Sequence, residues 1–183
     1  MKIVFFDDNL IILDIYDEIE NITVKTRKEI VWRDGFINGI NMQYVILNDD
    51  FQVNRGDLLD VNIVLGQMKE LLKLEVNESV NNACFKGFLS NITGWFYETE
   101  YHDQTNFSRR MLTLLNDQNK NVVEWKTADG VVREHTREQF LGVCNELDEF
   151  ITSKVNAGWV IKNVDIENAS SLEELKSINL NVE

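Results

Sequence analysis

The spacing of apolar residues first changes at Asp57-Leu58, and that change limits the fold more than any other feature. Before it, short apolar runs alternate with acidic and glycine-bearing turns, a pattern typical of antiparallel strands. After it, apolar residues recur every three or four positions, which is the period of a helix. Strands followed by helices predict an α+β fold.

Residues 1–54 are predicted to form a small antiparallel β domain. Asp34-Gly35 and Asn38-Gly39 are turn dipeptides, because the second residue of each tolerates a positive φ. A domain of about fifty residues buries little surface, so we expect it to pack against something else. The predicted strands are Lys2–Phe6, Ile11–Tyr16, Ile22–Thr26, Glu29–Trp32 and Met42–Leu47.

Residues 55–80 are predicted to form an amphipathic connector helix with a heptad pattern. Charged residues lie off its apolar seam. Two interpretations remain open: the helix packs on its own chain, or the seam is a short coiled coil through which the protein forms a homo-oligomer. The seam consists of Leu58, Val61, Leu65, Met68 and Leu72.

Residues 83–183 are predicted to form a C-terminal α+β domain with a β-hairpin and a long helix. Asp129-Gly130 supplies the hairpin turn, and Trp125 occupies a strand position where a large ring would pack. Thr136 and Gln139 have the spacing of a capping box, so the long helix should begin at Arg137.

The remaining elements of this domain follow from aromatic runs and caps. One or two strands are expected between Phe85 and Tyr101, and Asp103 is interpreted as the N-cap of the helix after them. Proline is absent from the sequence, so the long helix can continue to Ile166 if Gly158 is tolerated inside it. Ser171 should cap a short final helix.

Charge and cysteine content exclude several classes of function. The net charge is −13, with acidic residues along the whole chain, so we expect no binding to nucleic acid. The N-terminal apolar run is too short to span a bilayer, so we expect no membrane insertion. Cys84 and Cys144 are interpreted as reduced packing residues of a protein made in a cytoplasm.

Two clusters are weighed as sites. Glu98, Glu100 and His102 alternate on one predicted strand beside Asp103, which suits either a divalent metal site or a charged edge strand, and we expect no metal. Aromatic residues could stack on a saccharide, although a buried core explains them too. These aromatic candidates are Trp95, Tyr97 and Tyr101. Nucleophile and phosphate-loop motifs are missing, so no enzyme activity or cofactor is expected.

The stretch from about Ala83 to Ile178 resembles a domain of unknown function common in bacteriophage tail-fibre and tail-fibre-accessory proteins. Five motifs occur in the same order and at similar spacing. They are Gly87-Phe88, Asp103-Gln104-Thr105-Asn106, Trp125-Lys126-Thr127 with Asp129-Gly130, His135-Thr136-Arg137-Glu138-Gln139, and Ser171-Leu172-Glu173-Glu174-Leu175. In the first half, Asp34-Gly35 followed by Gly39-Ile40-Asn41 is similar to small N-terminal domains of tail proteins.

The resemblance implies a structural or assembly role in the tail, fibre or baseplate of a phage or prophage. It implies partners among other tail, fibre or baseplate proteins, and a location in the virion tail or in the host cytoplasm during assembly. The alternative is a receptor-binding module for a host cell-wall saccharide. The resemblance assigns structural roles to Asp103, Gln104, Asn106, Trp125, Asp129, Gly130, Thr136 and Gln139.

Overall fold

The computed structural model describes residues 1–183 and has the α+β architecture predicted from the sequence. Its contacts group the chain into two compact units. Unit 1 contains Met1–Asn77 and Val160–Leu180, and unit 2 contains Glu78–Trp159 and Asn181–Glu183. The sequential division into 1–54, 55–80 and 83–183 stays a prediction, because the contacts assign residues 160–180 to the unit that holds the N-terminal strands.

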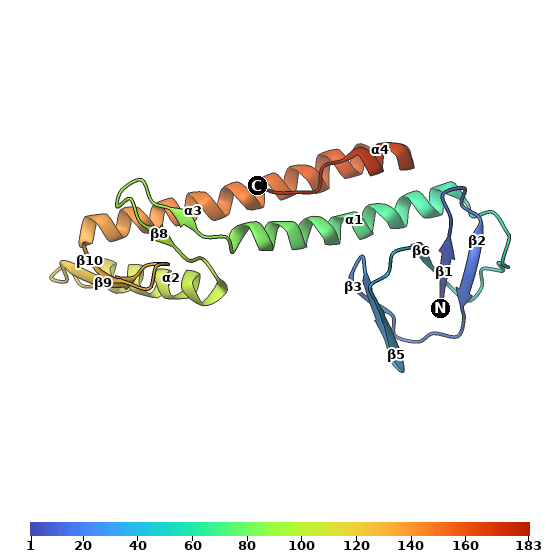
Figure 1. Ribbon diagram of the computed structural model, residues 1–183, viewed down its shortest axis with the longest axis horizontal. Helices are drawn as coiled ribbons and strands as arrows, with labels where there is room; N and C mark the ends of the chain where they lie inside the picture. The colour runs from blue at the N-terminus through green and yellow to red at the C-terminus, as the bar shows by residue number, and fades with distance from the viewer. The chain divides into compact units, whose positions relative to one another are not determined.

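Two three-stranded antiparallel sheets form the N-terminal part of unit 1 (Figure 1). The first has the order β2-β1-β6 and contains buried Ile3, Val4 and Val45. The second is a meander of β3, β4 and β5, in which Trp32 pairs with Gly35. The turn between them is Arg33-Asp34 rather than the predicted Asp34-Gly35, because Gly35 already begins β5 and has no positive φ. The strands are β1 (Lys2–Phe6), β2 (Ile12–Tyr16), β3 (Thr23–Thr26), β4 (Glu29–Trp32), β5 (Gly35–Asn38) and β6 (Gln43–Leu47). Strand β5 was not predicted, because its apolar stretch, Phe36-Ile37, is only two residues long and lies between two turn dipeptides.

The long helix α1 (Val61–Cys84) begins later than the sequence pattern suggested. Its part in unit 1 protects the free edge of β6. The side-chain oxygen of Gln67 accepts a hydrogen bond from the Ile46 N–H at 2.6 Å, and its amide nitrogen donates to the Ile46 carbonyl at 2.5 Å. This side chain therefore pairs with β6 as a neighbouring strand would.

The C-terminal segment of unit 1 contacts α1 through lysine side chains. Lys73 is bonded to the Glu167 carboxylate at 2.5 Å, and Lys69 donates to the Glu167 carbonyl at 2.7 Å. A π-helical stretch, η1 (Ile161–Ile166), precedes these contacts, and the short helix α4 (Leu172–Ser177) follows them. Ser171 caps α4 as predicted, because its hydroxyl accepts from the Glu174 N–H at 3.1 Å.

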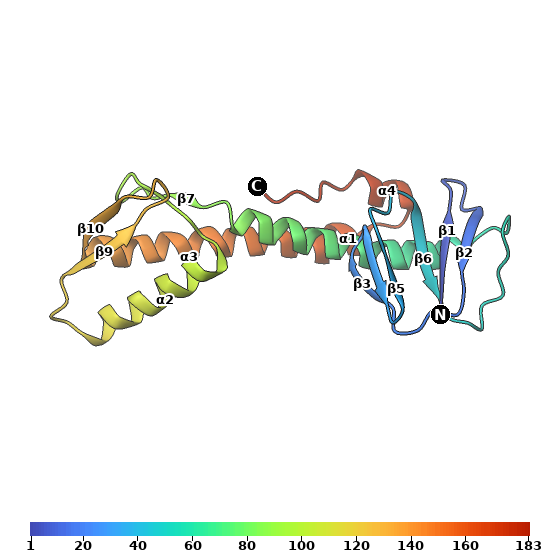
Figure 2. The same ribbon diagram turned by 60° about the horizontal axis from the view of Figure 1, so that its bottom comes forward.

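Unit 2 packs two helices and a hairpin around aromatic side chains (Figure 2). The predicted hairpin is confirmed by the antiparallel pair β9 (Val122–Lys126) and β10 (Val132–Thr136). The predicted long helix is also confirmed: α3 (Arg137–Val160) continues directly into η1. A two-residue strand pair, β7 (Phe88–Leu89) and β8 (Phe96–Tyr97), and the helix α2 (Tyr101–Asn116) complete the unit.

The core of unit 2 is a stack of rings drawn from three elements. Phe107 of α2 lies 5.6 Å from Phe140 of α3 and 4.2 Å from Trp125 of β9, measured between ring centroids. Because these aromatic contacts join residues far apart in sequence, they fix α2, α3 and the hairpin against one another. No helix is long and apolar enough to cross a membrane.

Candidate functional site

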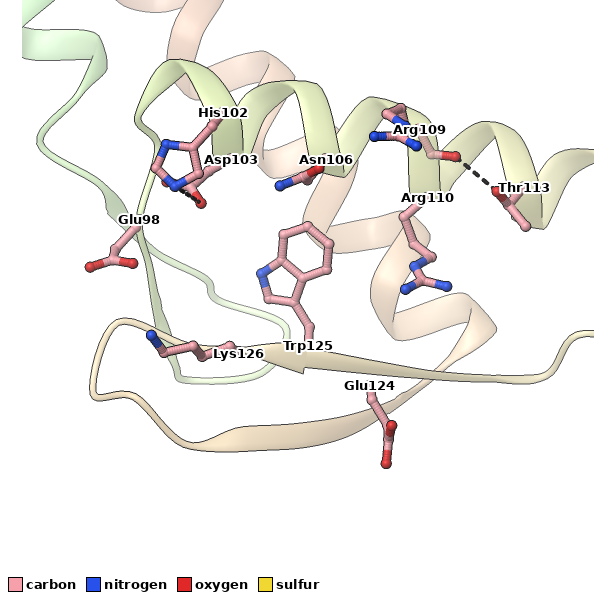
Figure 3. A pocket seen from close by; sticks show the side chains of 10 residues that line it. All are labelled: Glu98, His102, Asp103, Asn106, Arg109, Arg110, Thr113, Glu124, Trp125 and Lys126. Carbon is pink, nitrogen blue, oxygen red and sulfur yellow. Dashed lines mark hydrogen bonds and ion pairs between the residues drawn. The ribbon is translucent and has the colours of Figure 1, made fainter.

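A groove of about 630 Å³ lies between α2 and β9, and its lining residues all belong to unit 2 (Figure 3). We call it the Trp125 groove. Its lining residues are Glu98, His102, Asp103, Asn106, Arg109, Arg110, Thr113, Glu124, Trp125 and Lys126. Sequence reasoning had named several of these residues, but for separate reasons and not as one site.

Trp125 forms the centre of this groove. Its strand β9 alternates buried and exposed positions, which turns Val123 and Trp125 toward the helices. The ring is backed by Phe107 at 4.2 Å and Phe140 at 5.2 Å, and it rises from the strand toward α2 (Figure 3). Its indole N–H is neither fully buried nor hydrogen-bonded within the chain, so the groove side of the ring presents a donor.

The start of α2 corrects two expectations. Strand β8 ends at Tyr97 and α2 begins at Tyr101, so Glu98, Glu100 and His102 do not alternate on one strand. The N-cap is Glu100 rather than Asp103, whose carboxylate accepts from the Glu100 N–H at 3.1 Å. The earlier start is favoured because Asp103 then satisfies a backbone donor that the helix leaves free.

The acidic and imidazole groups at this helix start pair with each other. The His102 ring lies 3.2 Å from Asp103 and 3.6 Å from Glu100. No group of three or more His, Cys, Asp or Glu side chains has an arrangement that could hold a metal ion. Gln104 donates to the Thr99 carbonyl at 2.8 Å, which ties α2 to the segment before it.

Three cationic side chains of the groove, Arg109, Arg110 and Lys126, take part in none of the ion pairs of the structure. Figure 3 shows Arg110 directed from α2 toward β9, and Glu124 directed away from the groove. Sequence reasoning missed these cations. Two adjacent arginines in an acidic chain could have indicated a cationic site. Lys126 lies in the same groove only because β9 packs beside α2.

The hairpin turn beside the groove is held by its own ion pair. Asp129 accepts two hydrogen bonds from the Arg133 guanidinium at 2.7 and 2.6 Å, and one from the Thr127 hydroxyl at 2.7 Å. These bonds, with Arg133 first, lower the pKa of the Asp129 carboxyl below its usual value. Gly130 has a φ of 82°, as the predicted turn requires.

A buried polar chain crosses the core of unit 2. The Tyr97 hydroxyl lies 2.7 Å from Nε2 of His135, and Nδ1 of His135 lies 3.0 Å from the Arg133 carbonyl. Because a carbonyl only accepts, Nδ1 carries the proton and Tyr97 donates to Nε2. Burial lowers the pKa of His135, which favours this neutral form.

The three candidate saccharide contacts do not form one surface. Tyr97 is wholly buried, so its interpretation as a contact residue is wrong. Trp95 packs edge-on against His135 and is covered by the Arg133 guanidinium, 5.1 Å from the ring centroid. Tyr101 is 78% exposed at the start of α2. The sequence left both a saccharide-stacking surface and a buried core open for these residues. Tyr97 is buried through ring contacts with His135 of β10 and Phe107 of α2.

The capping box before α3 is confirmed atom by atom. The Thr136 hydroxyl accepts from the Gln139 N–H at 3.2 Å, and the Gln139 side chain accepts from the Thr136 N–H at 2.9 Å. This reciprocal pair satisfies two backbone donors at the helix start. Its geometry depends on residues three positions apart, which is why the sequence predicted it.

The heptad seam divides into buried and exposed parts. Met68 and Leu72 are buried within unit 1, and Leu65 is half-buried. Leu58 lies before α1 and is 73% exposed, so its placement on the helix is wrong, and Val61 at the helix start is also exposed. The C-terminal part of the seam therefore packs on its own chain.

The family model described as "Domain of unknown function (DUF4376)" matches residues 67–179. The match contains the groove, the hairpin, the capped starts of α2, α3 and α4, and most of α1. No curated protein and no solved structure matches the chain.

Proposed function

The chain belongs to the family of the domain of unknown function DUF4376, and we propose that within it this protein is a non-enzymatic structural or assembly protein of a phage or prophage tail. The proposal starts from the ordered motifs that resemble tail-fibre and tail-accessory domains. It places the protein in the distal tail, baseplate or fibre, or in the host cytoplasm during assembly.

One observation carries this proposal: most of the motif residues hold the fold. Thr136 and Gln139 cap α3, Ser171 caps α4, and Asp129 closes the hairpin turn. Gln104 anchors the start of α2. Motif residues that cap helices and form turns stabilise the fold, and this suits a family whose role is structural.

Mass spectrometry of purified particles tests the tail assignment. A virion component should be present at a constant ratio to the tail proteins, whereas an assembly protein should be absent from particles and crosslink to tail or fibre proteins in lysates of producing cells. Either result supports the proposal. Deletion of the gene with no loss of tailed, infectious particles would contradict it.

Self-association is the second part of the proposal. Leu58 and Val61 are the seam positions still exposed, so a second copy would contact the chain there. Sedimentation velocity should give a multiple of 21.3 kDa. Leu58→Asp should shift the protein to the monomer mass without unfolding it, because this side chain is largely outside the core.

The matched control is Asp57→Asn, which changes charge at the neighbouring position without adding a carboxylate to the apolar pair. It should leave the oligomer intact. A wild-type chain that sediments at 21.3 kDa at all concentrations tested would remove self-association from the proposal.

A further inference from the structure

We propose that the Trp125 groove binds an acidic saccharide, meaning a sugar residue that carries a carboxylate or a phosphate group. The inference rests on the ring, the hydrogen-bond donors and the charges that the fold brings together in unit 2. It goes beyond the tail assignment and does not depend on it.

The ring suits a sugar because it is rigid and partly exposed. Phe107 supports Trp125 from behind at 4.2 Å between ring centroids, so the indole cannot turn into the core when a ligand contacts it. One face of a pyranose ring consists of C–H groups and packs well on an aromatic surface. The free indole N–H can donate to a ring hydroxyl at the same time.

Polar groups around the ring match hydroxyls. The Asn106 side chain lines the groove from α2 and is in no hydrogen bond of the structure, and an amide both donates and accepts. Glu98 lies at the end of the groove where Lys126 also lies (Figure 3), and a carboxylate accepts from hydroxyls. A hydroxylated ligand uses both kinds of group.

The unpaired cations call for a negative charge on that ligand. Arg110 extends toward β9 at the opposite end from Lys126, so both ends of the groove offer a cationic donor (Figure 3). A guanidinium binds a carboxylate or phosphate through two parallel hydrogen bonds. These side chains are left without anionic partners although the chain carries 31 acidic residues.

The same charges argue against a polyanion. Glu98 and Asp103 accompany the three cations, so the charges of the groove nearly balance, while the whole chain has a net charge of −13. A polyanionic peptide or nucleic acid would be repelled over its length. A ligand with one anionic group and many hydroxyls avoids this repulsion.

Titrations of the whole chain, followed by the indole N–H signals of its four tryptophans in ¹⁵N-¹H spectra, test the proposal. Trp125→Phe identifies the Trp125 signal. The probes are glucuronate, which has one carboxylate, for a carboxylate sugar and glucose 6-phosphate for a phosphate sugar. At least one should shift the Trp125 signal in a saturable manner, and which one does identifies the acidic group.

Maltotriose, inorganic phosphate and polyglutamate complete the comparison. Neutral maltotriose and bare phosphate should bind at least tenfold more weakly, because each lacks one of the two features of the ligand. Equal binding of maltotriose or of phosphate would overturn the proposal, and so would saturable binding of polyglutamate alone. No shift with either acidic sugar would overturn it as well.

Arg110→Gln and Lys126→Gln should each weaken binding of the acidic sugar by about tenfold or more, since each removes a charge-assisted hydrogen bond. Lys86→Gln is the matched control, because it removes an exposed cation of unit 2 outside the groove. Equal weakening by Lys86→Gln would show a general charge effect and would contradict a site at Trp125.

Discussion

Gly87 is a residue of unit 2 where both the backbone conformation and a neighbouring backbone oxygen exclude a side chain. Its φ is +79°, and a Cβ there would lie 2.5 Å from the Tyr97 carbonyl oxygen and 2.5 Å from the Phe96 ring. Its N–H donates to Thr99 Oγ1 at 2.9 Å, and that hydroxyl donates to the Cys84 carbonyl at 2.6 Å. The family motif Gly87-Phe88 therefore has a steric reason.

Gly87→Ala should lower the free energy of unfolding by more than the ~1–2 kcal/mol that a left-handed conformation costs a residue with a Cβ. The control is Gly130→Ala, where φ is +82° but no atom lies within 4 Å of the added Cβ. The free energy of unfolding of that variant should fall only by the cost of the left-handed conformation. Urea denaturation measures both, and equal losses would contradict the steric explanation.

His135 should make the stability of the protein depend on pH. Its folded-state pKa is lowered, chiefly by burial, below the unfolded value of about 6.5. Between these two values the unfolded chain binds more protons, so stability falls as the pH drops from about 6.5 through the folded pKa. Above about 6.5 this group contributes its full stabilisation.

Urea unfolding at several pH values from neutral to mildly acidic tests this expectation. His135→Phe should flatten the pH dependence in that window, because the ring that gains the proton on unfolding is gone. An unchanged slope in His135→Phe would contradict the role of this residue.

Among the elements, α1 contributes a side chain that completes the edge of β6, and its sequence pattern does not reveal this contact. Gln67 is polar and reads as part of the solvent face of the helix, yet both ends of its amide bond to Ile46. Gln67→Leu would leave the N–H and carbonyl of Ile46 without partners. We expect a loss of about 1–3 kcal/mol in the free energy of unfolding.

Gln67→Glu is the informative comparison, because it keeps the shape and one acceptor oxygen but replaces the donor nitrogen. Its free energy of unfolding, measured by urea denaturation, should be lower than that of the wild type. The reason is that a carboxylate oxygen would face the Ile46 carbonyl in place of the amide donor. Wild-type stability in Gln67→Leu would show that water replaces the side chain at this edge.

Elements whose signals are local were predicted well. The hairpin at Asp129-Gly130 and the caps at Thr136 and Ser171 depend on residues within a few positions. The start of α2 was placed late because Asp103 serves equally well as an N-cap or as the third residue of the helix. Only the backbone conformation of Glu100 distinguishes the two.

For the molecule as a whole, the net charge of −13 is the dominant electrostatic fact. Its exposed ion pairs, such as Arg33 with Glu20 at 2.9 Å, contribute little and are weakened by salt. Repulsion among the excess carboxylates is also screened, and it is the larger effect because it acts over the whole chain. Added salt should therefore stabilise the fold.

Raising NaCl from about 0.01 M to about 0.15 M shortens the Debye length from about 30 Å to about 8 Å. The melting temperature should rise over this range, as measured by circular dichroism. MgCl₂ at equal ionic strength should give a similar rise. A much larger rise with magnesium would indicate specific binding to carboxylates, and a fall with NaCl would mean that the ion pairs outweigh the repulsion.

The candidate groove shows what sequence reasoning lacked at this scale. Trp125 was predicted to pack on a hairpin face and Asn106 to lie in a family motif, and both line the groove. Their meeting with Arg110 was not predictable, because it depends on how β9 packs against α2. Likewise, an alternating pattern cannot tell that Tyr97 is buried, since Phe107 of α2 and His135 of β10 pack against it.

The sequence by itself determined the order and type of most elements, because hydrophobic period, turn dipeptides and capping residues act over a few positions. Only the tertiary structure decided which side chains share a surface. Residues 160–180 join unit 1, Gln67 closes the edge of β6, and three cations line the same groove as Trp125. Each of these depends on contacts between distant parts of the chain, whose energies no local pattern records.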